Sequence, residues 1–283
     1  MGRMPLYPNI GNGYVGATLG CFPSNCGGDE LARDDALQGR RHGRSGTSTS
    51  TSARSGSGSG SVNRVANGVV RVAGVYSGVG TKTQRAALPG VHSVFVTGAG
   101  GKAAEYAGSA LDLENATFFN RTRLPGCGGA ILEQRWFAHR GMRSVLVYEM
   151  ELLHGPAGSG SDPSTASVAA MASCVVEMAS CNQDATADVN VTVKHTPIAG
   201  VVTRSLTTKV PESNLTSLVT VVQHFDQVTD TVALTIGQSK RFIAALRTSL
   251  PDDGNQPTAT AAADYATATA TPDGTLRSTH AEA

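Results

Sequence analysis

Residues 144–152, SVLVYEMEL, restrict what this chain can fold into more than any other feature of the sequence. Every second residue of the segment is large and apolar, from Leu146 to Leu152. Successive side chains of a β-strand point to opposite faces, so these residues would form one continuous apolar face. The opposite face would carry two valines and then two carboxylates, Glu149 and Glu151. The pattern predicts a strand that other strands must cover, because isolated strand pairs are barely stable in water.

Further segments of the chain have strand-like composition. AILEQRWFA (130–138) places Leu132 and Trp136 on one face of a strand, and ADVNVTVK (187–194) alternates strictly between apolar and polar residues. Other β-rich runs, bounded by Gly, Pro, Asn or Asp, are 69–76, 91–97, 199–208, 217–225 and 228–236. Residues 165–179 fit a helix or a strand equally well. So many short strands predict an all-β protein, a large β-sandwich built from residues 1–38 and 62–237.

Two segments are expected to lie outside the sandwich. Residues 39–61 contain no large apolar side chain, which predicts a disordered, low-complexity insertion. Residues 238–283 are predicted to form a short helix and then a linker or tail. The helix would begin after Ser239 and stop at Pro251, because apolar residues recur between them at helical spacing. The Ala- and Thr-rich residues 256–283 would form the tail.

Composition argues against several classes of function. The 23 Lys and Arg residues nearly balance 22 Asp and Glu, which gives no electrostatic basis for binding nucleic acid or a membrane surface. No apolar run approaches the ~18 residues of a membrane span, and no signal peptide is visible, so a cytoplasmic location is expected. An odd number of cysteines argues against a disulfide framework; they are Cys21, Cys26, Cys127, Cys174 and Cys181.

Two glycine-rich motifs suggest nucleotide binding but lack the required context. GNGYVG (11–16) matches the dinucleotide fingerprint, yet no buried strand precedes it and no helical pattern follows. TGAGGK (97–102) resembles a phosphate loop, but Val96 and Ala103 stand where that motif needs Gly and Ser or Thr. The cysteines do not have the spacing of a zinc site. We therefore expect no cofactor and no metal.

Glu149 and Glu151 are the most suggestive carboxylate pair. Residues i and i+2 of a strand point the same way with Cα atoms about 6.6 Å apart, at the edge of the range for glycosidase pairs. The same spacing arises on any solvent-facing strand, and a catalytic acid also needs burial to raise its pKa. We assign no catalytic residue on this basis.

Trp136, His139 and Arg140 are the predicted substrate-binding residues. An aromatic ring with His and Arg at the end of a strand can stack on a sugar and hydrogen-bond to its hydroxyl groups. The residues fit equally well with an alternative, in which Trp136 belongs to the core and a polar loop follows it.

Four stretches, in their order and spacing, resemble a known family: GNGYVG (11–16), VAGVYSG (72–78), ALDLENATFF (110–119) and LEQRWFAHRGMRSVLVYEMEL (132–152). They are similar to the N-terminal domain of glycoside hydrolase family 65, over about residues 5–38 and 62–225. The resemblance implies a β-sandwich of the galactose-mutarotase type, followed in the family by a helical catalytic barrel. The insertion at 39–61 departs from the family pattern.

The resemblance also implies a glycosidase and a carbohydrate partner. ALDLENATFF favours the branch that removes glucose from glucosyl-galactosyl-hydroxylysine in collagen-type glycans. The general-acid glutamate of the family lies in the barrel, which this sequence does not include, so the chain alone is expected to be inactive. Alternatives are a fragment of an acid trehalase or a disaccharide phosphorylase acting on another α-glucoside, or a stand-alone carbohydrate-binding or interaction module.

Overall fold

The computed structural model describes residues 9–19, 68–80, 83–124, 126–155, 173–180, 186–195, 200–211, 217–228, 231–254 and 256–283. The predicted insertion at 39–61 lies outside these residues, as does most of the ambiguous segment 165–179. The described end of that segment, Cys174–Ser180, is a β-strand.

One antiparallel sheet of eight strands dominates the described structure. Its spatial order is β14-β15-β16-β18-β12-β11-β10-β9. The strands are β9 (Glu105–Asp112), β10 (Thr117–Arg123), β11 (Ile131–Ala138), β12 (Val145–Leu153), β14 (Val189–His195), β15 (Val201–Thr208), β16 (Thr220–Asp226) and β18 (Ser239–Thr248). The long alternating segment thus forms a central strand, β12, between β11 and β18.

Smaller sheets complete the sandwich. One joins β1 (Asn9–Gly11), β2 (Val15–Thr18), β3 (Val69–Val72) and β6 (Leu88–Pro89), and another joins β17 (Thr231–Leu234), β13 (Cys174–Ser180), β7 (Val94–Gly98) and β8 (Lys102–Ala103). A hairpin of β4 (Tyr76–Ser77) and β5 (Gln84–Arg85) stands apart from both. The predicted all-β sandwich is confirmed.

The core lies between the large sheet and the smaller sheets. The apolar face predicted for residues 144–152 points into it, and Leu146, Tyr148, Met150 and Leu152 are all buried there. The opposite face of β12 carries Val145 and Val147, which join a second buried cluster beneath the C-terminal helices. The face of the large sheet that the helices cover therefore also carries a buried apolar cluster.

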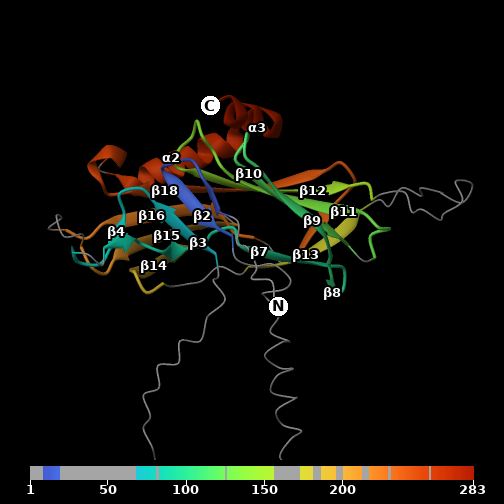
Figure 1. Cartoon of the computed structure of the whole chain (residues 1–283), viewed down its shortest axis with the longest axis horizontal. Helices are drawn as coiled ribbons and strands as arrows, with labels where there is room; N and C mark the ends of the chain where they lie inside the picture. The colour runs from blue at the N-terminus through green and yellow to red at the C-terminus, as the bar shows by residue number, and fades with distance from the viewer. Residues whose placement is uncertain are drawn as a thin grey trace, which may run out of the picture.

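Two helices cover part of the outer face of the large sheet. They are α2 (Pro257–Ala270) and α3 (Asp273–Glu282), reached through the short 3-10 helix η2 (Pro251–Asp253). Figure 1 shows both helices together on one side of the sheets. Ala268 and Leu276 pack against the sheet, so the segment predicted to be a linker is helical instead. Its few apolar anchors, set among Ala and Thr, gave no recognisable stripe in the sequence.

The helix predicted between Ser239 and Pro251 is wrong, because Ser239–Thr248 is the strand β18. Its middle residues are buried on both faces: Phe242 and Ala244 point into the sandwich core, and Ile243 and Ala245 lie beneath the helices. A strand that is buried on both faces loses its alternation of apolar and polar residues. The remaining apolar run also fits helical spacing, which misled the prediction.

Candidate functional site

Trp136 lies in the core of the sandwich and is 4% exposed. Its indole N–H donates a hydrogen bond of 3.0 Å to the carbonyl oxygen of His92. Its ring stacks on Tyr148, with 4.9 Å between centroids, and contacts Phe118 at 5.8 Å. Trp136 thus lies on the inner face of β11 among aromatic neighbours. This matches the alternative in which Trp136 belongs to the core.

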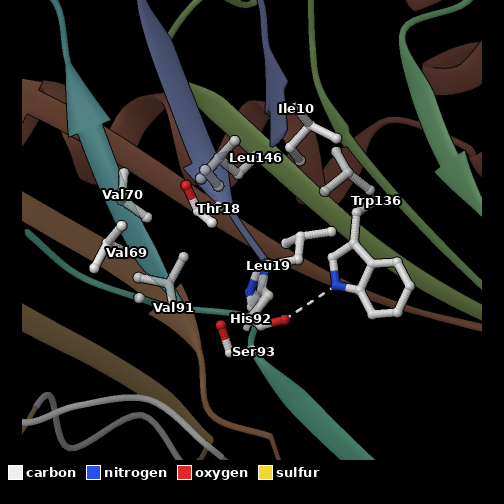
Figure 2. A pocket seen from close by; sticks show the side chains of 13 residues that line it. Ile10, Thr18, Leu19, Val69, Val70, Val91, His92, Ser93, Trp136 and Leu146 are labelled. Carbon is white, nitrogen blue, oxygen red and sulfur yellow. Dashed lines mark hydrogen bonds between the residues drawn. The ribbon is translucent and has the colours of Figure 1, made fainter. Parts of the chain in front are cut away.

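The space beside Trp136 is small. Figure 2 shows the cavity between Trp136, His92 and the aliphatic side chains of β1, β2 and β3. Its volume is about 10 Å³. That is room for about one water molecule and not for a sugar ring. Burial lowers the pKa of His92 to about 3, so the imidazole beside this cavity is neutral at physiological pH.

His139 lies on the other side of the large sheet, beneath α3. Its Nδ1 accepts a hydrogen bond of 2.9 Å from the backbone N–H of Met142. Because Nδ1 is an acceptor, Nε2 carries the proton, and it lies 3.1 Å from the carbonyl oxygen of Leu276 in α3. Burial, and then the nearby His280, lower the pKa of His139. The neutral ring therefore fastens the helix to the end of β11.

His280 makes the matching contact from α3. The backbone N–H of Arg140 donates to Nδ1 of His280 at 3.2 Å, and Nε2 of His280 lies 2.6 Å from the carbonyl oxygen of Asn115. Burial lowers the pKa of His280, and the charge of Arg140 lowers it further. The guanidinium of Arg140 donates to the carbonyl oxygen of Glu114. His139 and Arg140 thus belong to the interface with α3, away from Trp136, and sugar binding by these three residues stays a prediction.

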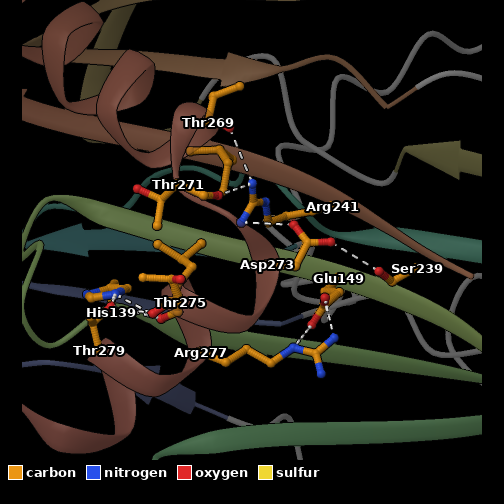
Figure 3. Close-up of polar contacts among 12 residues, drawn as sticks. His139, Glu149, Ser239, Arg241, Thr269, Thr271, Asp273, Thr275, Arg277 and Thr279 are labelled. Atoms are coloured by element: carbon orange, nitrogen blue, oxygen red, sulfur yellow. Dashed lines mark hydrogen bonds and ion pairs between the residues drawn. The ribbon is translucent and has the colours of Figure 1, made fainter.

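Glu149 and Glu151 share the outer face of β12, as their spacing predicts, and both contact arginines. Arg277 of α3 binds Glu149 through two hydrogen bonds, Nε to Oε2 at 2.8 Å and Nη2 to Oε1 at 2.5 Å (Figure 3). Arg135 of β11 lies 2.8 Å from Glu151 and 3.6 Å from Glu149. The side chain of Glu149 is 1% exposed. The pair is thus built into an ion network.

The ion network continues along the outer face of the sheet. Arg135 also pairs with Glu133, which in turn accepts a hydrogen bond of 2.5 Å from Arg121. Towards the other edge, Arg241 of β18 contacts Asp273 at 3.1 Å, at the start of α3 (Figure 3). Alternating charges on neighbouring strands stabilise one another, so this face positions α3 by charge pairing.

The GNGYVG motif is a structural turn between β1 and β2. The Oδ1 atom of Asn12 accepts hydrogen bonds from the backbone N–H groups of Tyr14 and Val15, at 3.0 and 2.9 Å. Its Nδ2 donates to the carbonyl oxygens of His139 and Arg143. One side chain thereby closes its own turn and joins it to the turn between β11 and β12.

The TGAGGK motif holds a carboxylate of the protein itself. Gly100 and Gly101 have φ angles of 72° and 69°, a left-handed conformation in which consecutive N–H groups point the same way. Both N–H groups donate to Glu177 of β13, at 2.7 and 2.9 Å. The loop therefore has the geometry of an anion-binding turn, with Glu177 as its anion.

Cys127 and Cys174 form a disulfide with 5.5 Å between their Cα atoms, although the cysteine count argued against a disulfide framework. The odd total did not exclude one bridge. Within the described ranges, no cluster of His, Cys, Asp or Glu side chains has the arrangement of a metal site. In the same part of the chain, no helix combines the length and apolar character that crossing a membrane requires. The cytoplasmic location stays a prediction.

Sequence reasoning missed Arg277 and His280, which hold α3 against the sheet. Both lie in the segment taken for a tail, where a lone Arg and a lone His carry no signal of their own. Glu149 and Arg135, which are direct register partners on β12 and β11, were the available hint. An uncompensated negative charge on that face would have predicted a further cation from elsewhere in the chain.

Comparisons with known proteins agree with this fold. Over 91 residues, the chain is 32% identical to a protein from Dictyostelium discoideum named Protein-glucosylgalactosylhydroxylysine glucosidase. In structure, it matches a chain described as a putative kojibiose phosphorylase from human microbiome, with a TM-score of 0.50 and 9% identity, over 97% of this chain. The resemblance to the N-terminal domain of glycoside hydrolase family 65 is confirmed.

The extent of these matches limits what they establish. The sequence match covers 29% of this chain and 12% of the glucosidase, and the structural match covers 34% of the solved chain. No family model matches the sequence. At 9% identity, the structural match concerns the fold alone. The chain therefore spans only a part of the family 65 proteins it resembles.

Proposed function

We propose that this chain is the N-terminal, non-catalytic part of a glycoside hydrolase that removes glucose from glucosyl-galactosyl-hydroxylysine. The observation that carries the proposal is the 32% identity over 91 residues to a glucosidase named for that substrate. The sandwich fold, which is similar to part of a putative disaccharide phosphorylase, supports a carbohydrate-active enzyme in general. The partner class is carbohydrate.

The contacts of Glu149 and Glu151 support a non-catalytic role for this part. An inverting glycosidase places two carboxyl groups on opposite sides of the scissile bond, with space for an attacking water. Arg277 and Arg135 occupy the space in front of this pair. The general acid of the proposed reaction therefore belongs to another part of the enzyme.

Glucose release by the purified 283-residue polypeptide tests the non-catalytic role. We expect no release from glucosyl-galactosyl-hydroxylysine, while the Dictyostelium relative serves as the positive control. Glu149→Gln and Glu151→Gln variants separate a true activity from a contaminant. Release by the unmodified polypeptide that disappears in either variant would assign catalysis to this pair and overturn the proposal.

Transcript sequencing beyond the codon of Ala283 tests the relationship to a larger enzyme. We expect the reading frame to continue into a helical catalytic domain. The longer protein is then assayed on glucosyl-galactosyl-hydroxylysine, on trehalose, and on kojibiose with phosphate. Preference for the first substrate supports the glucosidase. Preference for either disaccharide would replace it with a trehalase or a phosphorylase, and a stop codon at this point would favour a stand-alone binding module.

A further inference from the structure

A groove of about 170 Å³ lies on the outer side of the small sheet formed by β1, β2 and β3. Its walls include the backbone of the GNGYVG turn and two basic side chains, Arg71 of β3 and Arg85 of β5. The groove lies outside the helix-covered face of the large sheet. Neither the ion network nor the aromatic core uses these two arginines.

Missing side chains create the groove. In the register of the small sheet, Gly11 of β1 pairs with Gly16 of β2, and Gly16 pairs with Arg71 of β3. This row across three strands therefore carries a single side chain, that of Arg71. A ligand above the two glycines can reach the backbone directly, next to the guanidinium.

The neighbouring row adds polar atoms on the same face. Asn9 pairs with Thr18, and Thr18 pairs with Val69. The Thr18 hydroxyl donates to Oδ1 of Asn9 at 2.6 Å, and Nη1 of Arg71 reaches the Thr18 Oγ1 at 3.5 Å. Among the described residues, no acceptor forms a hydrogen bond with the Nδ2 group of Asn9. The same holds for the remaining N–H groups of Arg71.

The charge of the groove is uncompensated within the described part of the chain. Arg121, Arg135 and Arg241 each pair with an acid, whereas neither Arg71 nor Arg85 takes part in an ion pair there. A guanidinium presents five N–H donors in a planar fork that matches carboxylate and phosphate oxygens. Two such groups around one hollow favour an anionic ligand.

We propose that this groove binds a small anionic sugar, one that carries a phosphate or carboxylate group. Arg71 takes the anionic group, with Arg85 at the rim of the groove as a second cation. The backbone of Gly11 and Gly16, with the amide of Asn9, receives the sugar ring. A cavity of about 150 Å³ accommodates a benzene ring, so an open groove of about 170 Å³ can receive the ring of a monosaccharide while its substituents extend into solvent.

An NMR titration of the ¹⁵N-labelled 283-residue polypeptide tests the site with four probes: glucose 6-phosphate, glucuronate, inorganic phosphate and glucose. Low salt, about 10 mM, keeps the screening of the two arginine charges weak. We expect saturable shifts centred on the amides of Gly11, Gly13 and Gly16, with glucose 6-phosphate or glucuronate binding more tightly than glucose and phosphate. The ratio between those two sugars identifies the anionic group.

Matched variants separate the groove from general charge attraction. Arg71→Gln should weaken binding at least about tenfold, the size expected for losing a hydrogen bond to a charged group. Arg123→Gln removes the same charge from an exposed arginine on β10 and should leave binding unchanged. Gly16→Ala keeps the charge and reduces the hollow. Its added Cβ would lie 3.3 Å from the carbonyl oxygen of Ile10, so a thermal melt checks that it folds.

Three results would overturn the proposal. The first is the lack of saturable shifts with any anion at about 20 mM, well above the millimolar affinity expected of so small a contact. The second is an equal loss of binding in the Arg71→Gln and Arg123→Gln variants. The third is inorganic phosphate or glucose binding as tightly as both anionic sugars, which would remove the anionic sugar as the ligand class.

Discussion

Arg277, in the last helix of the chain, donates two hydrogen bonds to the carboxylate of Glu149, whose side chain is 1% exposed in the middle of the eight-stranded sheet. The two residues are 128 positions apart in the sequence. Bidentate pairing between arginine and a carboxylate fixes orientation as well as distance. Because the side chain of Glu149 is shielded from water, the contacts with Arg277 and Arg135 replace those with solvent. The pair therefore locates α3 on the sheet.

Replacing Glu149 with Gln should loosen α3. The variant removes the negative charge that Arg277 and Arg135 both contact in the unmodified protein. We expect the free energy of unfolding to fall by about 1–3 kcal/mol, below the figure for fully buried pairs because Arg277 is 42% exposed. Urea denaturation measures the loss, and hydrogen exchange should show faster opening of the α3 amides than of β12.

Glu105→Gln is the matched control for that experiment. Glu105 pairs with Arg123 at 3.7 Å on the edge of the sheet, and both side chains are about half exposed or more. Exposed pairs contribute about 0–1 kcal/mol, so this variant should be nearly neutral. Equal losses in Glu105→Gln and Glu149→Gln would contradict the role assigned to the contact with Arg277.

Acidification should weaken the attachment of α3 to the sheet, which depends on His139 and His280. Burial lowers the pKa of both His139 and His280 in the folded protein, so the unfolded chain binds more protons below the ordinary histidine pKa of about 6.5. Their contribution to stability is complete above that pH and decreases as the pH falls below it. Protonation at Nδ1 also removes the acceptors used by the N–H groups of Met142 and Arg140. Denaturation at a series of pH values from about 7.5 to 5 measures the effect.

Variants assign this pH dependence to the two residues. A His139→Gln/His280→Gln double variant should be less stable at neutral pH and should show a flatter decline on acidification. Burial also lowers the pKa of His92 and His224, so some decline should persist. His154→Gln, at an exposed position, should leave the profile as it is. An unaltered profile in the double variant would contradict the assignment.

Trp136→Ala should destabilise the sandwich by about 3–5 kcal/mol, the range for removing a large buried aromatic side chain. Trp136→Phe keeps a ring against Tyr148 but loses the hydrogen bond to His92, so a smaller loss is expected. Chemical denaturation compares the two variants. A stable Trp136→Ala protein that has lost affinity for glucosyl-galactosyl-hydroxylysine would instead favour the predicted sugar contact.

Reduction of the Cys127–Cys174 bridge should lower the free energy of unfolding by about 2–4 kcal/mol, because the bridge closes a loop of 47 residues. The bridge joins the turn after β10 to the start of β13, and so connects two sheets. Denaturation with and without reductant measures the loss, and thiol labelling with mass analysis identifies the two cysteines. A Cys127→Ser/Cys174→Ser variant should be insensitive to reductant at this site. A wild-type protein that is also insensitive would show that the bridge does not form.

The sequence predicted well the strands that carry polar or charged side chains on one face. Residues 144–152, 130–138 and 187–194 became β12, β11 and β14 with small shifts at their ends. Each keeps charged or polar side chains on one face, such as Glu149 and Glu151 on β12, and local sequence expresses that alternation even where the structure buries the polar face too. The shared face of Glu149 and Glu151 follows from the same rule and was predicted in the same way.

The elements that failed depend on what packs above them. The sequence of β18 fitted a helix because both of its faces are apolar. The sandwich core covers one face, and α2 and α3 cover the other. The sequence of the two helices was taken for a tail because their buried apolar residues are only Leu276 and a few alanines. Neither segment shows its partner in its own sequence.

The sequence alone determined the all-β class, the central strands and the relationship to family 65, because these depend on local alternation and on the order of short motifs. Only the tertiary structure decided what the candidate residues do. It placed Trp136 in the core, His139 and Arg140 beneath α3, and Glu149 opposite Arg277. The role of a charged or aromatic side chain depends on burial and on partners far along the chain, and chain folding brings those partners together.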